Sequence, residues 1–453
     1  MPLRRHAFAV ALTVPSLALG QAPTITIHAG TVLDGRGGVA RNTTIVVAGS
    51  HIIRLDPALT TATYDLGRLT VMPGGIDTHV HLTSHFDANG RAHNDPGGAE
   101  PLQQTVLYAE ENAYHALLAG ITTVQSIGSM LDREMRDAIA RGTIPGPRVI
   151  TSLDWITPEA GDADGLRRAV QQRVAGGADV IKILGSKSIR EGGGPTLTED
   201  QFRAACGEAK AHGRRCVVHA HAAEAARRAV LGGATSIEHG VMLDEAKAHG
   251  LRAVVHAHAA EAARRAVMAG CTTIEHGVLL DDATLDLMAE HGTYFDPNLY
   301  LVFQNYFDNK ARFLGIENYT EEGYAYMHRA VPLVLTVFQH ALQRPKLRIV
   351  FGTDAVAGAF GKNWEELIYR VQVGGQPPMA AIVSATSLAA QSLDLADTLG
   401  AIAPGLEADL IGLDGNPLED ITALRRVVFV MKGGKVYKSP LAERREGCIL
   451  QRN

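Results

Sequence analysis

The sequence predicts an α/β barrel with a small β-sandwich beside it, the sandwich being built from both ends of the chain. Three observations support this fold class: β-branched runs broken by turns at both ends, apolar runs alternating with amphipathic segments between them, and histidine, lysine or aspartate motifs where those apolar runs end. Strand–helix alternation is typical of parallel βαβ units. With 453 residues, 46% of them hydrophobic and 20% charged, the chain is long enough to bury a large core.

The N-terminus has the three parts of a secretory signal. A basic start precedes an apolar run over residues 7–19, and small residues come before a cut after Gly20. A disordered or buried start is the alternative interpretation. Pro15 and the shortness of the apolar run argue against a membrane-spanning helix. We therefore expect residues 1–20 to be removed from an exported protein, periplasmic or secreted, that has no membrane segment.

The remaining ends of the chain have the pattern of antiparallel strands. After residue 20 come TITIHAGTVLDGRGG and TTIVVAGSHIIRL, and similar β-branched runs with glycine turns return in ADLIGLDGNPL and RRVVFVMKGGKVY. We expect residues 21–72 and 399–453 to form one composite β-sandwich. The barrel is then residues 73–398, which contain apolar runs such as ITTVQSI, RVITSL, DVIKILG and RIVFGTD.

Charge and cysteine content exclude two classes of protein. The formal net charge is −5, and no run of lysine and arginine has the length of a binding patch, so we expect no nucleic-acid partner. None of the four cysteines has CxxC spacing, which argues against a structural zinc knuckle. An exported protein can hold one disulfide, but the sequence does not choose a pairing.

A tandem duplication interrupts the barrel region at residues 209–282. The segments 209–245 and 246–282 are both 37 residues long, and 29 of their aligned positions are identical. Each segment spans a strand–helix–strand unit, so two units compete for one place in the barrel. A barrel that held both copies would have too many strands. We therefore expect one copy to lie outside the barrel wall.

The first chemical signal is the pair His79 and His81 in the run GGIDTHVHL. Residues two apart on a strand point to the same side, so both imidazoles can face one metal ion. Imidazole is a good ligand for zinc and its neighbours in the first transition row. A coincidental pair is the alternative, but the apolar strand start after Pro73 favours the metal interpretation.

Two further signals come from a lysine and an aspartate at predicted strand ends. Lys182 in ADVIKILG either extends into solvent, or is a buried amine whose lowered pKa allows carboxylation. Asp354 in VFGTDA either caps a helix or contributes to an active site. The carboxyl ends of the strands build the active site in βα barrels. Several such residues at predicted strand ends are less easily explained by coincidence than any one of them alone.

Each copy of the repeat places two histidines at strand ends, 20 residues apart. If the first copy is excluded from the barrel, His256 and His276 are the barrel histidines, and the excursion lies at the bottom, away from the chemistry. We prefer this arrangement. If the second copy is excluded, His219 and His239 take their place. The opposing outcome is that the duplication has ruined the barrel and its site.

In combination these motifs resemble the amidohydrolase superfamily, and more closely its branch of imidazolonepropionase-like proteins and metal-dependent dipeptidases. VMPGGIDTHVHL is similar to the strand 1 motif, VIKIL to the strand 4 lysine, VVHAH to strand 5, IEHG to strand 6 and GTDA to strand 8. The resemblance covers nearly all of the mature chain and implies a (β/α)8 TIM barrel. The sequence departs from the pattern after strand 3, where it lacks the His-containing loop of many relatives.

The resemblance also implies a binuclear centre with two divalent metal ions, zinc by default, bridged by N6-carboxylated Lys182. A hydroxide between the ions would attack the substrate carbonyl, and Asp354 would pass a proton from the water to the leaving amine. The ligands that the resemblance implies are His79, His81, Lys182, His256, His276 and Asp354, with His219 and His239 as the duplicate alternatives.

The leading functional hypothesis is hydrolysis of an amide or peptide bond in a small substrate, either a dipeptide or an N-acyl amino acid. The alternatives are a hydrolase of cyclic amides of the imidazolone or lactam type, and a catalytically inactive metal-binding relic. Arg190 either receives a substrate carboxylate or is a solvated loop residue, and Tyr294 is a second substrate-binding candidate. Homo-oligomers are common in the family that the sequence resembles, but nothing in the sequence establishes one.

Overall fold

A computed structural model describes most of the chain. The described residues are 24–93, 100–127, 129–185, 196–219, 228, 236–238, 254–256, 267, 273–277, 279–316 and 319–440. The predicted signal segment, Arg190 and His239 lie outside these ranges. No helix of the described part is long and apolar enough to cross a membrane.

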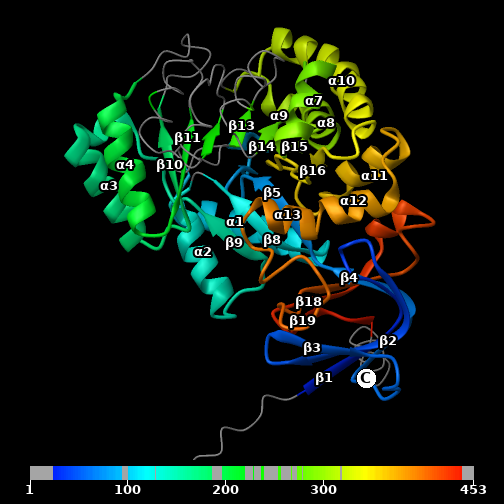
Figure 1. The fold of residues 1–453 in the computed structure, drawn as a ribbon. Coiled ribbons are helices and arrows are strands. Elements are labelled where there is room, and N and C mark those ends of the chain that lie inside the picture. The colour runs from blue at the N-terminus through cyan, green and yellow to red at the C-terminus, as the bar shows by residue number, and fades with distance from the viewer. Residues whose placement is uncertain are drawn as a thin grey trace, which may run out of the picture.

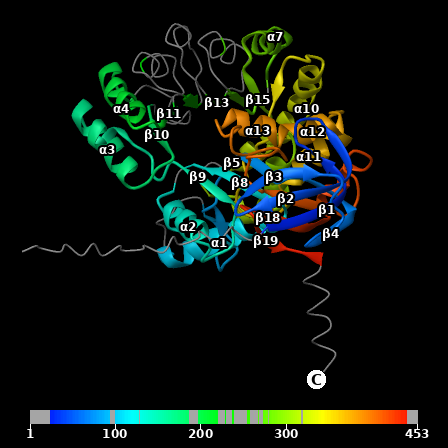
Figure 2. The same ribbon diagram turned by 60° about the horizontal axis from the view of Figure 1, so that its bottom comes forward.

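Strands from both chain ends form one seven-stranded sheet, which Figures 1 and 2 show beside the helical body. Its order is β19-β18-β17-β4-β1-β2-β3, and the antiparallel pair β4–β17 joins the N-terminal strands to the C-terminal ones. The strands are β1 (Thr24–Leu33), β2 (Val39–Ala48), β3 (His51–Asp56), β4 (Tyr64–Pro73), β17 (Leu410–Leu413), β18 (Val427–Lys432) and β19 (Lys435–Lys438).

The parallel strands between these ends form three sheets instead of one continuous ladder. Their orders are β5-β8-β9, β10-β11-β12 and β13-β14-β15-β16. Bridges Val80–Ala355 and Ile156–Ile183 link neighbouring sheets. The strands are β5 (Gly75–Val80), β8 (Ile121–Ser126), β9 (Arg148–Thr151), β10 (Val180–Leu184), β11 (Arg215–His219), β12 (Ser236–Glu238), β13 (Val254–His256), β14 (Thr273–Glu275), β15 (Tyr294–Asp296) and β16 (Arg348–Ile349). A two-stranded hairpin, β6 (His85–Phe86) and β7 (Ala92–His93), follows β5.

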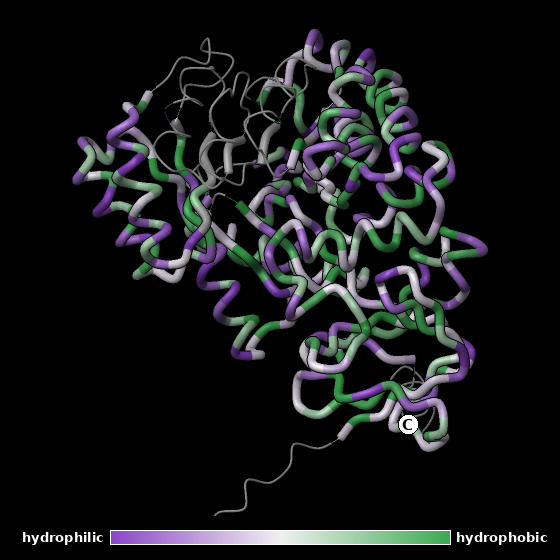
Figure 3. Tube along the Cα trace, viewed as in Figure 1, coloured by the Kyte–Doolittle hydropathy of each residue, from purple (hydrophilic) through white to green (hydrophobic). Residues whose placement is uncertain are grey.

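Helices cover the outside of the parallel strands (Figure 1), and their hydropathy alternates along the chain (Figure 3). This alternation buries one face of each helix against the strands. The α-helices are α1 (Leu102–Leu118), α2 (Leu131–Ala140), α3 (Ala163–Ala175), α4 (Glu199–Ala211), α7 (Asp282–His291), α8 (Leu301–Asp308), α9 (Lys310–Phe313), α10 (Glu321–Leu342), α11 (Trp364–Gln372), α12 (Pro378–Ser384) and α13 (Ser387–Ser392).

Both copies of the repeat contribute strands to the wall. In the first copy, β11 pairs in parallel with β10 and with β12. In the second copy, β13 pairs with β14, and β14 pairs with β15. The expectation that one copy lies outside the wall is therefore wrong for the described strands. The two copies are nearly identical in sequence, so both have the same local preference for forming strands. Local preference therefore does not indicate which copy is the additional one.

A disulfide bond joins Cys206 of α4 to Cys216 of β11. Both cysteines are fully buried in the core between α3, α4 and the neighbouring strands. The bond therefore fixes the strand of the first repeat copy to the helix that precedes it.

Candidate metal centre

His79, His81 and Asp354 lie together at the carboxyl ends of the first and last parallel strands. The Nε2 atoms of His79 and His81 are 3.3 Å apart. Oδ1 of Asp354 is 3.7 Å from Nε2 of His79 and 3.3 Å from Nε2 of His81. The backbone holds this geometry, because the amide of Asp354 donates to the carbonyl of His79 and the amide of His81 donates to the carbonyl of Ala355.

The three side chains form a donor set that fits a divalent metal ion. One ligand atom from each of His79, His81 and Asp354 lies within 4.8 Å of the other two. Two imidazole nitrogens and a carboxylate oxygen are ligands that suit zinc and other first-row metals. His79 is 7% exposed, so the set is shielded from bulk water on one side.

The electrostatics of Asp354 favour its ionised form. Burial raises the pKa of the carboxyl, but the hydrogen bond with His81 and the charges of His79, His81 and His276 together lower it well below its usual value. Asp354 and His276 also have positive φ angles of 53° and 65°. Such angles are uncommon for non-glycine residues and concentrate at functional sites.

His276 of the second repeat copy lies close to this cluster. Its amide donates to the carbonyl of Asp296 at the end of β15, and its charge acts on Asp354. His219 ends β11 and is paired with Leu184, whereas His256 ends β13 and is paired with Glu275. His276, the second-copy histidine that was predicted for strand 6, therefore lies near the candidate metal centre.

Lys182 is buried in the middle of β10. Only 6% of the residue is exposed, and its backbone is paired with Val217 of β11. This burial removes the alternative that the lysine extends into solvent. Carboxylation is the other interpretation, and it requires the neutral form of the amine.

Two buried carboxylates behind the centre were not identified from the sequence. Asp77 accepts hydrogen bonds from the Thr353 hydroxyl (2.6 Å) and from Nδ2 of Asn363 (2.8 Å), and burial raises its pKa to about 6. Asp296 accepts from the Thr78 hydroxyl (2.6 Å) and from the amide of Gly352 (2.7 Å). Both carboxylates tie strands to each other around the candidate ligands. Asp77 stands two residues before His79 in the motif GGIDTHVHL, and this spacing on the same strand is the sequence feature that could have identified it.

Tyr294 lies away from the candidate centre. It is the first residue of β15, and its hydroxyl faces Nη1 of Arg348, the first residue of β16, at 3.4 Å. Parallel strands begin at the same edge, and the amino ends are at the opposite edge from Asp354. This placement argues against the predicted role of Tyr294 in substrate binding. The pattern GTYFDPN could not tell which end of such a short strand a residue occupies.

An aromatic cluster beside Asp354 was also missed. Tyr306 of α8 accepts a hydrogen bond from the Tyr319 hydroxyl at 3.1 Å and packs on Phe313, with ring centroids 5.0 Å apart. Burial, Tyr319 and the charge of Asp354 raise the pKa of Tyr306 well above its usual value. Nδ2 of the Asn305 side chain donates to the carbonyl of Ala357 at 2.9 Å, which holds α8 against the segment after Asp354.

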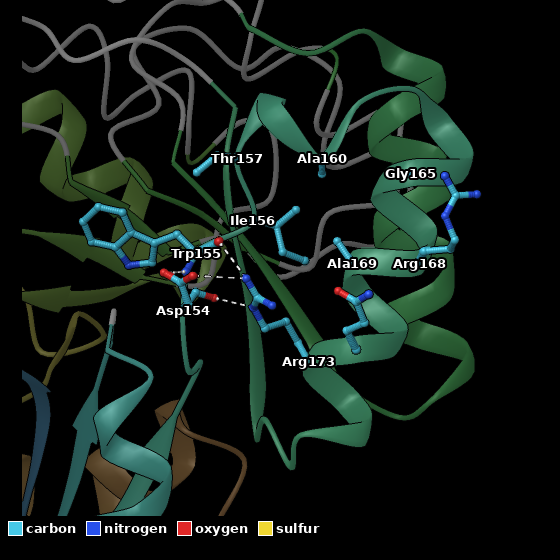
Figure 4. A pocket seen from close by; sticks show the side chains of 10 residues that line it. Asp154, Trp155, Ile156, Thr157, Ala160, Gly165, Arg168, Ala169 and Arg173 are labelled. Atoms are coloured by element: carbon cyan, nitrogen blue, oxygen red, sulfur yellow. Dashed lines mark hydrogen bonds and ion pairs between the residues drawn. The ribbon is translucent and has the colours of Figure 1, made fainter. Parts of the chain in front are cut away.

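A surface pocket of about 410 Å³ lies elsewhere, between the segment after β9 and helix α3 (Figure 4). Trp155 at its edge is 37% exposed, and Asp154 binds Arg173 at 3.2 Å. None of the candidate metal ligands lines this pocket, so we assign it no role in the chemistry.

Comparison with known families covers most of the chain. Residues 70–437 match the sequence model described as "Amidohydrolase family". The matched stretch begins within β4 and ends within β19, so it includes all the parallel strands and the candidate ligands.

Individual relatives match over nearly their whole length. The ochratoxinase of Aspergillus niger is 27% identical over 97% of this chain and 91% of its own. A crystal structure described as a Xaa-Pro dipeptidase with bound methionine in the active site is 30% identical, with a TM-score of 0.68 over 92% of this chain and 100% of its own. A prolidase complexed with N-methylphosphonate-L-proline is 25% identical, with the same TM-score and coverage. These matches confirm the predicted fold class, a TIM barrel with a β-sandwich.

Proposed function

The chain belongs to the amidohydrolase family, and on this premise we propose that it hydrolyses the amide or peptide bond of a small substrate, a dipeptide or an N-acyl amino acid. The observation that carries the proposal is the close group formed by His79, His81 and Asp354 at the carboxyl ends of the strands. A divalent metal ion held there supplies a Lewis acid that polarises the carbonyl and lowers the pKa of a water molecule.

Asp354 is the residue to which we assign the proton transfers. An aspartate carboxylate is ionised at neutral pH, and in this form Asp354 can accept a proton from the attacking water. The bond to the leaving nitrogen then breaks as Asp354 returns that proton to the nitrogen. The amine therefore leaves as a neutral molecule, and the carboxylate is regenerated for the next cycle.

The finer composition of the centre is part of this proposal. We assign the second ion to Lys182, in its carboxylated form, and to one histidine from strand 5 and one from strand 6. The burial of Lys182 and the proximity of His276 to Asp354 support this assignment. Zinc is the proposed metal, because imidazole and carboxylate ligands suit it.

The similar proteins guide the choice of substrate. The names Xaa-Pro dipeptidase, prolidase and ochratoxinase favour dipeptides with C-terminal proline as the first candidates, followed by N-acyl amino acids. No observation on this chain favours a cyclic amide.

We also propose export with loss of residues 1–20. The mass of the mature protein from the producing cell tests this, because an intact N-terminus would contradict it.

The test is hydrolysis of a panel of dipeptides, N-acyl amino acids and lactams by metal-loaded protein. We expect activity on linear amides that is lost on chelation, and a fall of at least a hundredfold in His79→Asn and Asp354→Asn. His28→Gln in the seven-stranded sheet is the control and should keep wild-type activity. Folded, metal-loaded protein without activity on any linear amide would refute the proposal.

A further inference from the structure

We infer that the additional unit of the duplication is the central one, residues 220–256, so that the first copy supplies His219 and the second copy supplies His276 to the metal centre. This inference rests on the proposed function and makes its ligand set definite. It differs from both assignments that take the two histidines from one copy.

The duplication allows three ways of leaving out one unit. Removal of any 37 consecutive residues within 209–282 restores the length of a single strand–helix–strand unit. Removing the second copy leaves His219 and His239, and removing the first leaves His256 and His276. Removing residues 220–256, which is also a length of 37, leaves His219 and His276. Contacts outside the repeat decide among the three, because the copies themselves are nearly identical.

The disulfide bond anchors the first copy beside strand β10. Cys216 of β11 bonds to Cys206 of α4, and the second copy has Ala253 at the corresponding position. Only the first copy can therefore form this bond. In the resulting sheet, His219 is paired with Leu184, which is two residues beyond Lys182 on β10. By the alternation of a strand, this register position is on the same face as Lys182.

The second copy is anchored beside strand β15. Its strand β14 runs parallel to β15 with Glu275 paired to Asp296, and the amide of His276 donates to the carbonyl of Asp296 at 2.9 Å. Helix α7 follows directly and leads back into β15, so chain connectivity places the second copy next to strand 7.

The wall is interrupted where the two copies meet. The sheet containing Lys182 ends at β12, and the sheet containing β14 begins at β13. These two strands contact each other, but in the described part of the chain no ladder pairs them. The strands β12 and β13 are thus the two that are additional to an eight-stranded order. Without them, β11 and β14 become the neighbouring strands 5 and 6.

Four single variants test the inference through metal content. The chain offers matched controls, because His219 and His256 have the same flanking residues from Val217 to His221, as do His239 and His276 in IEHGV. We expect His219→Asn and His276→Asn to lose about one metal ion per chain relative to the wild type. Their twins His256→Asn and His239→Asn should keep the wild-type metal content.

The outcomes separate this inference from the proposed function. Loss of metal in His256→Asn with retention in His219→Asn would overturn the inference, and so would loss in His239→Asn with retention in His276→Asn. Equal effects in each twin pair would also overturn it. A wild-type chain that is folded, supplied with metal and still binds none would refute the metal-dependent function itself. If the wild-type chain binds about two metal ions but the four variants lose metal in a different pattern from the one expected, only the inference is refuted.

A deletion gives a second measurement that does not depend on single variants. Removal of residues 220–256 joins His219 to Ala257 and keeps Cys206 and Cys216. We expect this shortened chain to retain the metal content and the disulfide of the wild type. Removal of residues 209–245 is the comparison, since it replaces Cys216 by Ala253 and should abolish the disulfide. The two shortened chains differ only where Arg214 and Cys216 are replaced by Leu251 and Ala253, so the disulfide is the readout that separates them. Loss of metal from the first shortened chain would contradict the inference.

Discussion

Asp132 is a carboxyl group that the fold keeps away from water. It stands in the first turn of α2, is completely buried, and accepts a hydrogen bond from the Thr151 hydroxyl at 3.1 Å. Burial raises its pKa to about 7 from a usual value of 3.8, although hydrogen bonds with Ser126 and Thr151 oppose the rise. The protonated form is therefore the one that the folded state prefers.

The pH dependence of stability follows from this raised pKa. Below about pH 4 the Asp132 carboxyl is protonated in both the folded and the unfolded state. Between about pH 4 and pH 7 the unfolded state releases this proton while the folded state keeps it, so the unfolding free energy falls as the pH rises. Each unit of pKa difference corresponds to about 1.4 kcal/mol, which makes about 4 kcal/mol the upper bound. We expect the unfolding free energy of the wild type to fall between pH 4 and 7 relative to Asp132→Asn. Parallel curves from urea unfolding would contradict this.

Tyr306 is a tyrosine close enough to Asp354 to feel its charge, and we propose that it acts on the substrate. Its hydroxyl accepts from Tyr319, so its own proton can be donated to another group, and the charge of Asp354 and burial keep that proton on. We expect Tyr306→Phe to lower kcat/KM for an amide substrate about tenfold, as loss of one hydrogen bond of about 1.4 kcal/mol does. Tyr319→Phe is the control and should have a smaller effect. An unchanged kcat/KM in Tyr306→Phe would exclude the role.

At the scale of elements, the disulfide between α4 and β11 has a measurable effect. It joins residues 10 apart in the sequence, and a closed loop of this size stabilises by about 2–3 kcal/mol through the entropy of the unfolded chain. We expect Cys206→Ala/Cys216→Ala to lower the unfolding free energy by this amount under oxidising conditions. Under reducing conditions the variant and the wild type should agree closely. A persistent difference there would assign the effect to packing of the two buried side chains.

The sequence predicted those elements whose signals are local. The motif GGIDTHVHL marks the end of β5, and VFGTDA places Asp354 after β16, so the cluster of His79, His81 and Asp354 could be predicted from strand ends alone. The path of the repeat could not, because two copies with 29 identical positions have equal local preferences. Only distant partners distinguish them, and Cys206 lies outside both copies.

At the scale of the whole molecule, a partly buried ion-pair group joins the barrel to the seven-stranded sheet. Arg148 of β9 binds Asp409 at 2.6 Å and Glu407 at 3.4 Å, both just before β17. Asp409 is 6% exposed, so removing Arg148 leaves a buried carboxylate that keeps the hydrogen bond from the Gly433 amide (2.7 Å) but loses its arginine partner. The pair Arg425–Glu365 at 2.6 Å is the matched comparison, because the arginine side chain there is 51% exposed.

These two ion pairs predict different costs for the same substitution. We expect Arg148→Ala to lower the unfolding free energy by about 2–4 kcal/mol, since the Asp409 carboxylate loses its partner in a water-poor site. Arg425→Ala should cost less than about 1 kcal/mol, because water replaces the arginine at the surface. Denaturant unfolding of both variants at neutral pH measures the difference. Equal losses of stability in the two variants would contradict the prediction, because the buried carboxylate of Asp409 would then make no difference to the cost.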